Sequence, residues 1–252
     1  MIQTKYKHIF CDLDGTLFGK NLIVSPEVVN KVNQISQKVG FSICTARGQV
    51  EAFPILTNIK LISPQIIENG ATVITPEGKI LRQFSIPLDI APNIIRFLSD
   101  FKIWKKICTN NTMIDFESHN YDDNITKIAL QDLTLEMFNQ IASEIQKYDI
   151  LIFSKSIAAH KPDFLTMDIT HKEATKQKAI DFILKELNLK KEEVIGIGDS
   201  YNDNTLFEAC GLKVAMGNAV DEIKKMADFI APDVNNSGVA YVIDKFILGD
   251  SA

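Results

Sequence analysis

The hydrophobic pattern near the N-terminus predicts a strand, a helix and a second strand. Apolar side chains dominate residues 7–13 and again residues 41–47. Between them, residues 24–40 carry a serine and a proline at the start, four apolar side chains at helical spacing and a closing glycine. Such a βαβ unit implies parallel strands that are joined by a right-handed crossover.

Helices and strands alternate again in the C-terminal part of the chain. We expect helices over 176–190, 204–211 and 220–226, and strands over 192–200, 212–219 and 227–232. Both ends of the chain therefore form halves of one α/β layer structure, a Rossmann-like core built on a parallel sheet.

The middle of the chain follows a different pattern, in which strands come in pairs. Helices are expected over 89–101 and 134–148, and strands over 103–108, 112–116, 127–133, 149–154 and 163–169. This is the pattern of an α+β domain. We predict that residues 85–169 form an α+β cap inserted into a core of residues 1–84 and 170–252. The chain enters this cap through a hairpin over 72–84 with a Pro76-Glu77-Gly78 turn.

Composition and charge narrow the class of protein. Of the 252 residues, 46% are hydrophobic and 23% are charged, a balance that allows a sizeable folded core. The net charge of −5 gives no electrostatic reason to expect a nucleic acid or an anionic membrane as partner. No stretch is apolar enough to span a bilayer, and the four cysteines lack metal-binding spacing. We therefore expect a reduced, cytoplasmic protein; the sequence leaves its oligomeric state open.

Reactive side chains follow three strands of the predicted core. The first strand ends in Asp12-Leu13-Asp14, the second in Thr45-Ala46-Arg47, and a later one in Gly198-Asp199, with Asn202 and Asp203 close behind. Ligands bind beyond the carboxyl ends of strands in open parallel sheets, so these groups should converge. Three carboxylates in one crevice need a cation, and hard oxygen ligands without His or Cys favour Mg²⁺.

A phosphate ester is the natural substrate for such a site. Backbone N–H groups of the turn from Leu13 to Gly15 and the Thr45 hydroxyl could bind phosphoryl oxygens. A lysine would complete the charge clamp, and Lys176 lies on the inward face at the start of its predicted helix. Lys172 and Lys178 remain alternatives.

The motifs DLDGTL, CTAR, a lysine near the end of the insertion and GDSYND resemble the four motifs of the haloacid dehalogenase superfamily. The insertion between the second and third motifs is similar to that of its Cof-type phosphatases. The segments ENGATVITPEGKIL and VAMGNA also resemble that branch.

The resemblance implies a role for each matching residue. Asp12 would be the nucleophile that forms an aspartyl-phosphate, and Asp14 the general acid and base. The residues that would bind the substrate or its phosphate are Leu13, Thr45, Ala46, Arg47, Lys176 and Asn202. Mg²⁺ would be bound by Asp12, the carbonyl of Asp14 and Asp199, while Asp203 would support the site from behind. Arg47 is alternatively a surface ion-pair residue or a contact to the cap.

These roles predict a Mg²⁺-dependent phosphatase that acts on small phosphorylated metabolites, such as sugar phosphates or phosphorylated cofactors like pyridoxal phosphate. The cap would exclude water and set specificity. A phosphomutase of the phosphomannomutase type and a non-catalytic sensor of phosphorylated ligands are the alternatives. Cap residues that could face the substrate are Asn110, Glu117 and Lys161, although their spacing does not distinguish them from other cap residues.

Overall fold

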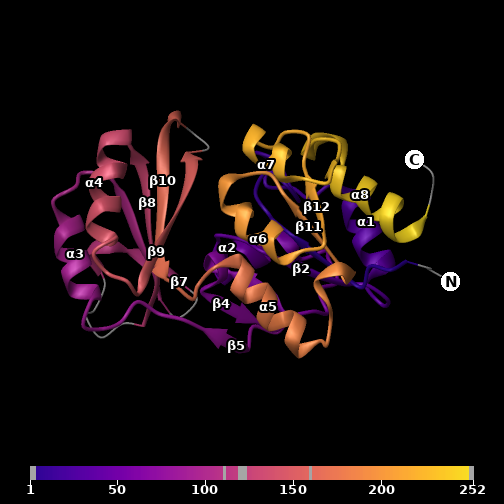
Figure 1. Cartoon of the computed structure of the whole chain (residues 1–252), viewed down its shortest axis with the longest axis horizontal. Helices are drawn as coiled ribbons and strands as arrows, with labels where there is room; N and C mark the ends of the chain where they lie inside the picture. Colours follow the sequence, from indigo (N-terminus) through magenta and orange to yellow (C-terminus); the bar gives the residue numbers. More distant parts are fainter. Residues whose placement is uncertain (1–3, 110–111, 119–123, 159–160, 250–252) are drawn as a thin grey trace.

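The computed structural model describes residues 4–109, 112–118, 124–158 and 161–249. Figure 1 shows two parts, an α/β core on the right and a smaller α+β cap on the left. The predicted fold class is confirmed. The boundaries placed at 84/85 and 169/170 stay a prediction.

The core is built on a five-stranded parallel sheet with the order β13-β12-β11-β1-β2. Its strands are β1 (His8–Cys11), β2 (Gly40–Ile43), β11 (Val194–Gly198), β12 (Leu212–Ala215) and β13 (Phe229–Ile230). All of them were expected from the apolar runs. The chain crosses from β1 to β2 on one side, whereas β11, β12 and β13 extend the sheet on the other side. The switch point therefore lies between β1 and β11.

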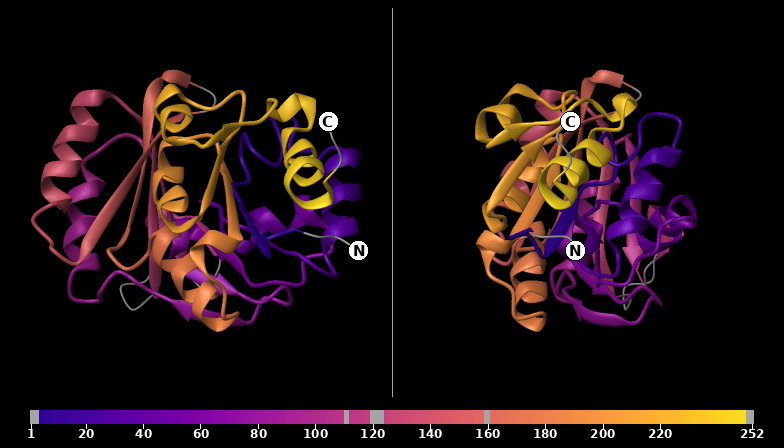
Figure 2. Two further views of the ribbon diagram at one scale, coloured as in Figure 1. Left: turned by 45° about the vertical axis from the view of Figure 1, so that its right-hand side comes forward. Right: turned by 90° about the vertical axis from the view of Figure 1, so that its right-hand side faces the viewer.

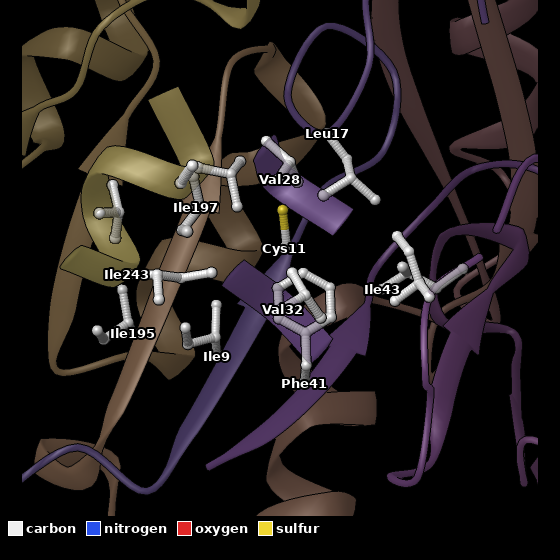
Figure 3. Packing of buried hydrophobic residues seen from close by; sticks show 14 of the residues in the cluster. Ile9, Cys11, Leu17, Val28, Val32, Phe41, Ile43, Ile195, Ile197 and Ile243 are labelled. Atoms are coloured by element: carbon white, nitrogen blue, oxygen red, sulfur yellow. The ribbon is translucent and has the colours of Figure 1, made fainter. Parts of the chain in front are cut away.

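Helices cover both faces of this sheet (Figure 2). On one face pack α1 (Pro26–Ile35) and α8 (Gly238–Ile243), and on the other α5 (Lys176–Glu186), α6 (Asn204–Ala209) and α7 (Asp221–Met226). Side chains alternate along β1: Ile9 and Cys11 pack under the first pair of helices (Figure 3), and Phe10 packs under the others.

The first helix differs from its prediction at the C-terminal end. Ser25 caps α1 by accepting a hydrogen bond from the N–H of Val28, as expected. The helix stops at Ile35, and Gly40 instead begins β2. A Cβ at Gly40 would lie 2.2 Å from Nδ1 of His8, so the glycine is required by close packing between β1 and β2.

A three-stranded antiparallel sheet lies beside the core sheet. It consists of β3 (Gln65–Ile67), β4 (Thr72–Ile74) and β5 (Ile80–Gln83), and the pairing of β4 with β5 confirms the predicted hairpin. No strand was expected at β3, which lies beside the end of β2 through a parallel bridge between Cys44 and Ile66. A short helix, α2 (Gln49–Ala52), follows β2.

The cap is an antiparallel sheet with two helices on one face. The strand order is β7-β6-β8-β10-β9. The elements are α3 (Ala91–Ser99), β6 (Trp104–Thr109), β7 (Thr112–Asp115), β8 (Ile125–Leu133), α4 (Leu135–Ile145), β9 (Leu151–Ala158) and β10 (Lys161–His171). In Figure 1, α3 and α4 cover the outer face of the sheet, so its inner face is turned toward the core. In the described ranges, no helix has both the length and the apolar character that crossing a membrane requires.

Candidate active site

The carboxyl ends of β1 and β11 bring the first and last motifs together. The N–H of Asp12 donates to the carbonyl of Ile197 at 2.9 Å, and the N–H of Cys44 donates to the carbonyl of Cys11 at 2.8 Å. Residues just beyond β1, β2 and β11 therefore share one crevice at the switch point of the sheet, where open α/β sheets bind ligands.

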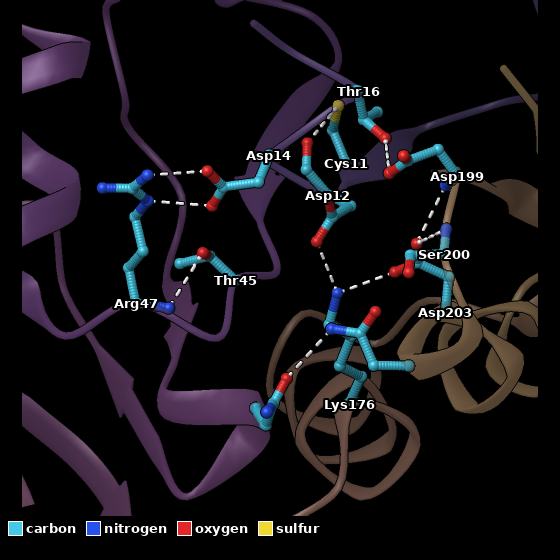
Figure 4. A network of polar contacts seen from close by, with 12 residues as sticks. Cys11, Asp12, Asp14, Thr16, Thr45, Arg47, Lys176, Asp199, Ser200 and Asp203 are labelled. Carbon is cyan, nitrogen blue, oxygen red and sulfur yellow. Dashed lines mark hydrogen bonds and ion pairs between the residues drawn. The ribbon is translucent and has the colours of Figure 1, made fainter. Parts of the chain in front are cut away.

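Lys176 lies at the centre of this crevice (Figure 4). Its Nζ donates to Oδ1 of Asp12 at 2.6 Å and to Oδ1 of Asp203 at 2.7 Å. The lysine is 1% exposed, and burial alone would lower its pKa. The two carboxylates outweigh that effect and raise the pKa, so the side chain is charged.

The start of α5 explains how this lysine reaches the crevice. Thr175 caps the helix by accepting from the N–H of Lys178, which makes Lys176 the first helical residue. Gly70, at φ +99°, allows the close approach, since a Cβ there would lie 2.3 Å from the carbonyl of Thr175. Lys172 is exposed and Lys178 pairs with Glu173, so of the three candidate lysines only Lys176 contacts Asp12.

Asp203 is fully buried and both of its oxygens have partners. Oδ1 accepts from Lys176, and Oδ2 accepts from the N–H groups of Asp199 and Ser200 at 2.9 and 3.0 Å. A Cβ at Gly198 would lie 2.5 Å from Cγ of Asp203, so this position also favours glycine. Asp203 thus holds the loop after β11 and orients Lys176 from behind.

The chemistry of the donor set fits a divalent cation. Ligand oxygens of Asp12, Asp199 and Asp203 lie within 4.8 Å of one another. Burial and the neighbouring Asp203 raise the pKa of Asp12 well above its usual value, and the same causes raise the pKa of Asp199 to about 7. The single charge of Lys176 does not balance the negative charge of these three carboxylates. Because both oxygens of Asp203 already accept hydrogen bonds, Asp12 and Asp199 are the carboxylates better suited to bind a metal.

Asp199 is further oriented by Thr16, whose hydroxyl donates to Oδ1 at 3.0 Å. A Cβ at Gly15, at φ +81°, would lie 2.3 Å from Oδ2 of the same aspartate. The turn after β1 therefore holds this carboxylate through one hydrogen bond and one close approach.

Asp14 points away from the cluster toward Arg47. The guanidinium donates from Nε to Oδ2 at 2.8 Å and from Nη2 to Oδ1 at 2.7 Å. The structure shows Arg47 in an ion pair with Asp14, and its binding to a substrate stays a prediction. Thr45 is buried and its hydroxyl accepts from the N–H of Arg47 at 3.0 Å, so its own proton can point to a phosphoryl oxygen.

A pocket of about 410 Å³ opens between core and cap next to Lys176. Asn202 lines it, together with Asn69 from the turn after β3 and Ser154 from β9. Of the suggested cap residues, Asn110 lies outside the described residues. In the described part of the cap, Glu117 is exposed and Lys161 pairs with Asp132, and neither lines this pocket.

Sequence reasoning missed Asn69, Lys127 and Asp168. The amide of Asn69 donates to Asp168 on β10, and Lys127 on β8 donates to the carbonyl of Ala46. The Asn-Gly pair at the end of β3 was a usable turn signal for Asn69. No local signal identifies the other two, which read as ordinary strand residues.

Comparison with known proteins places the chain in a family. The model of the haloacid dehalogenase-like hydrolases matches residues 9–243. Phosphoglycolate phosphatase 1 of Saccharolobus solfataricus is 29% identical over 97% of each chain. Phosphatase YwpJ of Bacillus subtilis is 27% identical, over 94% of this chain and 98% of that one. A crystal structure from Thermotoga maritima superposes with a TM-score of 0.79 at 27% identity, over 95% of this chain and 97% of that one.

The chain belongs to the haloacid dehalogenase-like hydrolase family, in its Cof-type branch, and is an enzyme of the phosphoric monoester hydrolase class.

Proposed function

We propose that the protein is a Mg²⁺-dependent phosphatase of small phosphorylated metabolites that works through an aspartyl-phosphate on Asp12. One observation carries the proposal: Asp12 lies at the switch point of the sheet, in contact with Lys176 and within reach of Asp199. A nucleophilic carboxylate, a phosphate-binding cation and a metal ligand are thus in one crevice.

Asp12, Asp199 and the backbone carbonyl of Asp14 are the groups that would hold Mg²⁺. When bound, the ion supplies positive charge that stabilises the charge developing on phosphoryl oxygens. The shortage of positive charge around the carboxylates supports this assignment.

The residues of the chain divide the reaction into two displacements. In the first, a carboxylate oxygen of Asp12 forms a bond to phosphorus while the ester P–O bond breaks, and Asp14 gives its proton to the leaving alcohol. In the second, Asp14 removes a proton from water, whose oxygen attacks phosphorus and releases Asp12 and inorganic phosphate. Lys176 and Thr45 hold the phosphoryl oxygens throughout.

The pocket supports a small substrate with both polar and apolar groups, since Ile152 and Phe153 also line it. Its lining includes Asn69, Ser154 and Asn202, and its volume of about 410 Å³ suits a metabolite rather than a polymer. We place sugar phosphates, phosphorylated cofactors such as pyridoxal phosphate, and small phosphorylated acids like that of the Saccharolobus relative in the candidate set. The four cysteines are free and buried, which fits a reducing cytoplasm.

Phosphate release from a panel of phosphorylated metabolites, with Mg²⁺ or with EDTA, tests the proposal. The native protein should release phosphate only with metal, and Asp12→Asn should lose nearly all activity. Asp100→Asn, an exposed aspartate at the end of α3, is the matched control and should keep full activity. Undiminished release by Asp12→Asn contradicts the proposal, and so does isomer interconversion without free phosphate, which indicates a mutase.

A further inference from the structure

An ion pair between a buried lysine and a partly buried aspartate, on the inner face of the cap sheet, contacts the core. Lys127 on β8 lies opposite Thr170, and Asp168 on the neighbouring β10 lies opposite Ala129. Their chain neighbours, such as Ile128, pack instead under α3 and α4 in the apolar interior of the cap. Strand alternation therefore turns Lys127 and Asp168 toward the core.

Lys127 of this ion pair connects the cap to the loop after β2. The side chain of Lys127 is 3% exposed, and its Nζ donates to the carbonyl of Ala46 at 2.6 Å and lies 3.6 Å from Oδ1 of Asp168. Burial by itself would lower the pKa of this lysine. The carboxylates of Asp168 and Glu68 outweigh burial and raise the pKa above its usual value, so the ammonium group is charged. Both members of the ion pair lie on the cap, so moving the cap away would keep the pair together and break the hydrogen bond from Lys127 to the carbonyl of Ala46.

A chain of hydrogen bonds continues from Asp168 into the active site. Oδ2 of Asp168 accepts from Nδ2 of Asn69 at 2.6 Å, and Oδ1 of Asn69 accepts from Nδ2 of Asn202 at 3.2 Å. An ionised carboxylate can only accept, so Asn69 must present its NH₂ group to Asp168 and its oxygen to Asn202. Asn202 then uses its own NH₂ group, which leaves its carbonyl oxygen for the pocket.

We propose that Asp168, held by Lys127, is a positioning residue that fixes the amide orientation of Asn202 through Asn69 when the cap is docked. The carbonyl oxygen of Asn202 then accepts a hydrogen bond from a substrate hydroxyl or from water and does not bind the phosphoryl group. This assignment rests on the proposed phosphatase function for its catalytic consequence, but not for the orientation itself.

A double-mutant cycle tests the catalytic consequence. Asp168→Asn, whose amide can present either end to Asn69, should lower kcat/KM about tenfold, while in an Asn202→Ala background it should change kcat/KM less than twofold. Asp115→Asn removes an exposed ion pair with Lys106 on the far edge of the cap and should leave kcat/KM unchanged. If the fold-losses of the two single variants multiply in the double variant, Asp168 acts independently of Asn202 and the proposal is overturned.

Two further measurements keep the test decisive if Asp168→Asn folds poorly or if the native protein lacks phosphatase activity. Asn69→Gly, which suits the local φ of +57°, breaks the chain of hydrogen bonds but keeps both members of the ion pair, and it should match the kinetic loss of Asp168→Asn. In ¹H–¹⁵N spectra, the side-chain amide signals of Asn202 should shift in Asp168→Asn but not in Asp115→Asn. Unmoved Asn202 signals would overturn the orientation, whereas inactivity of the native protein would overturn only the proposed function.

Discussion

Arg47 donates two parallel hydrogen bonds to the carboxylate of Asp14, at 2.7 and 2.8 Å. The pair is partly solvated, with about half of the Asp14 side chain exposed. It therefore holds the proposed general acid away from the buried carboxylates around Lys176. A phosphate ester that competes for the guanidinium would release Asp14 for proton transfer.

Removal of Arg47 should affect catalysis far more than stability. We expect Arg47→Ala to lower kcat/KM by about tenfold to hundredfold, because charge-assisted hydrogen bonds to phosphate contribute roughly 1.5–3 kcal/mol. A partly exposed ion pair stabilises the fold by only about 0–1 kcal/mol, so urea unfolding should change little. Steady-state kinetics and urea titrations on the same samples measure both. Unchanged kcat/KM would mean that Arg47 is only a surface ion-pair residue.

Loss of the buried lysine should destabilise the core. Lys176→Met leaves Asp12 and Asp203 without their shared cation, and we expect the free energy of unfolding in EDTA to fall by about 3–5 kcal/mol. Lys178→Met is the matched control on the same helix, since its pair with Glu173 is about 40% exposed and contributes at most about 1 kcal/mol. Equal losses in the two variants would contradict the structural role assigned to Lys176.

Mg²⁺ should stabilise the native protein through Asp199. A ligand that binds only the folded state adds about 2.7 kcal/mol at roughly 100 times its dissociation constant, so thermal unfolding should shift upward on adding Mg²⁺ and back on adding EDTA. Asp199→Asn should lose most of this shift, while Asp100→Asn should keep it. A full shift in Asp199→Asn would remove this carboxylate from the metal site.

His8 predicts a specific pH dependence of stability. Its ring is buried, lies 2.8 Å from the Ser42 hydroxyl, and has a pKa that burial lowers from 6.5 to about 3. Between pH 6.5 and pH 3, His8 binds a proton in the unfolded chain but stays neutral in the folded chain. The stability that the neutral, buried ring contributes is therefore lost as the pH falls toward 3. Between pH 6.5 and 4.5 the native protein should lose about 2 kcal/mol more than His8→Gln.

Urea unfolding of both chains across this pH range gives the difference directly. Other titrating groups are common to the two proteins and largely cancel. If the stabilities of the two proteins change in parallel with pH, the pKa of His8 is not lowered in the folded state.

The strand-end motifs could be predicted because their signals are local. Asp12 and Asp199 each follow an apolar run, and the rule that parallel strands end at one edge brings them together without coordinates. The end of α1 could not be predicted in this way, since the packing of Gly40 against His8 joins residues on different strands. β3 was not predicted for the same reason, since its place beside β2 depends on a bridge between Cys44 and Ile66.

The sequence by itself determined the α/β core with its inserted cap, the carboxylates at the switch point and a short set of candidate lysines. These properties follow from hydrophobic periodicity and from the residues that end each strand. Only the tertiary structure decided that Lys176 is the lysine beside Asp12, that Asp14 pairs with Arg47, and that Lys127 and Asp168 connect the cap to Asn202. Each of these contacts joins segments far apart in the chain, and the contacts of Lys127 with Ala46 and of Asp168 with Asn69 also require the cap to be docked on the core.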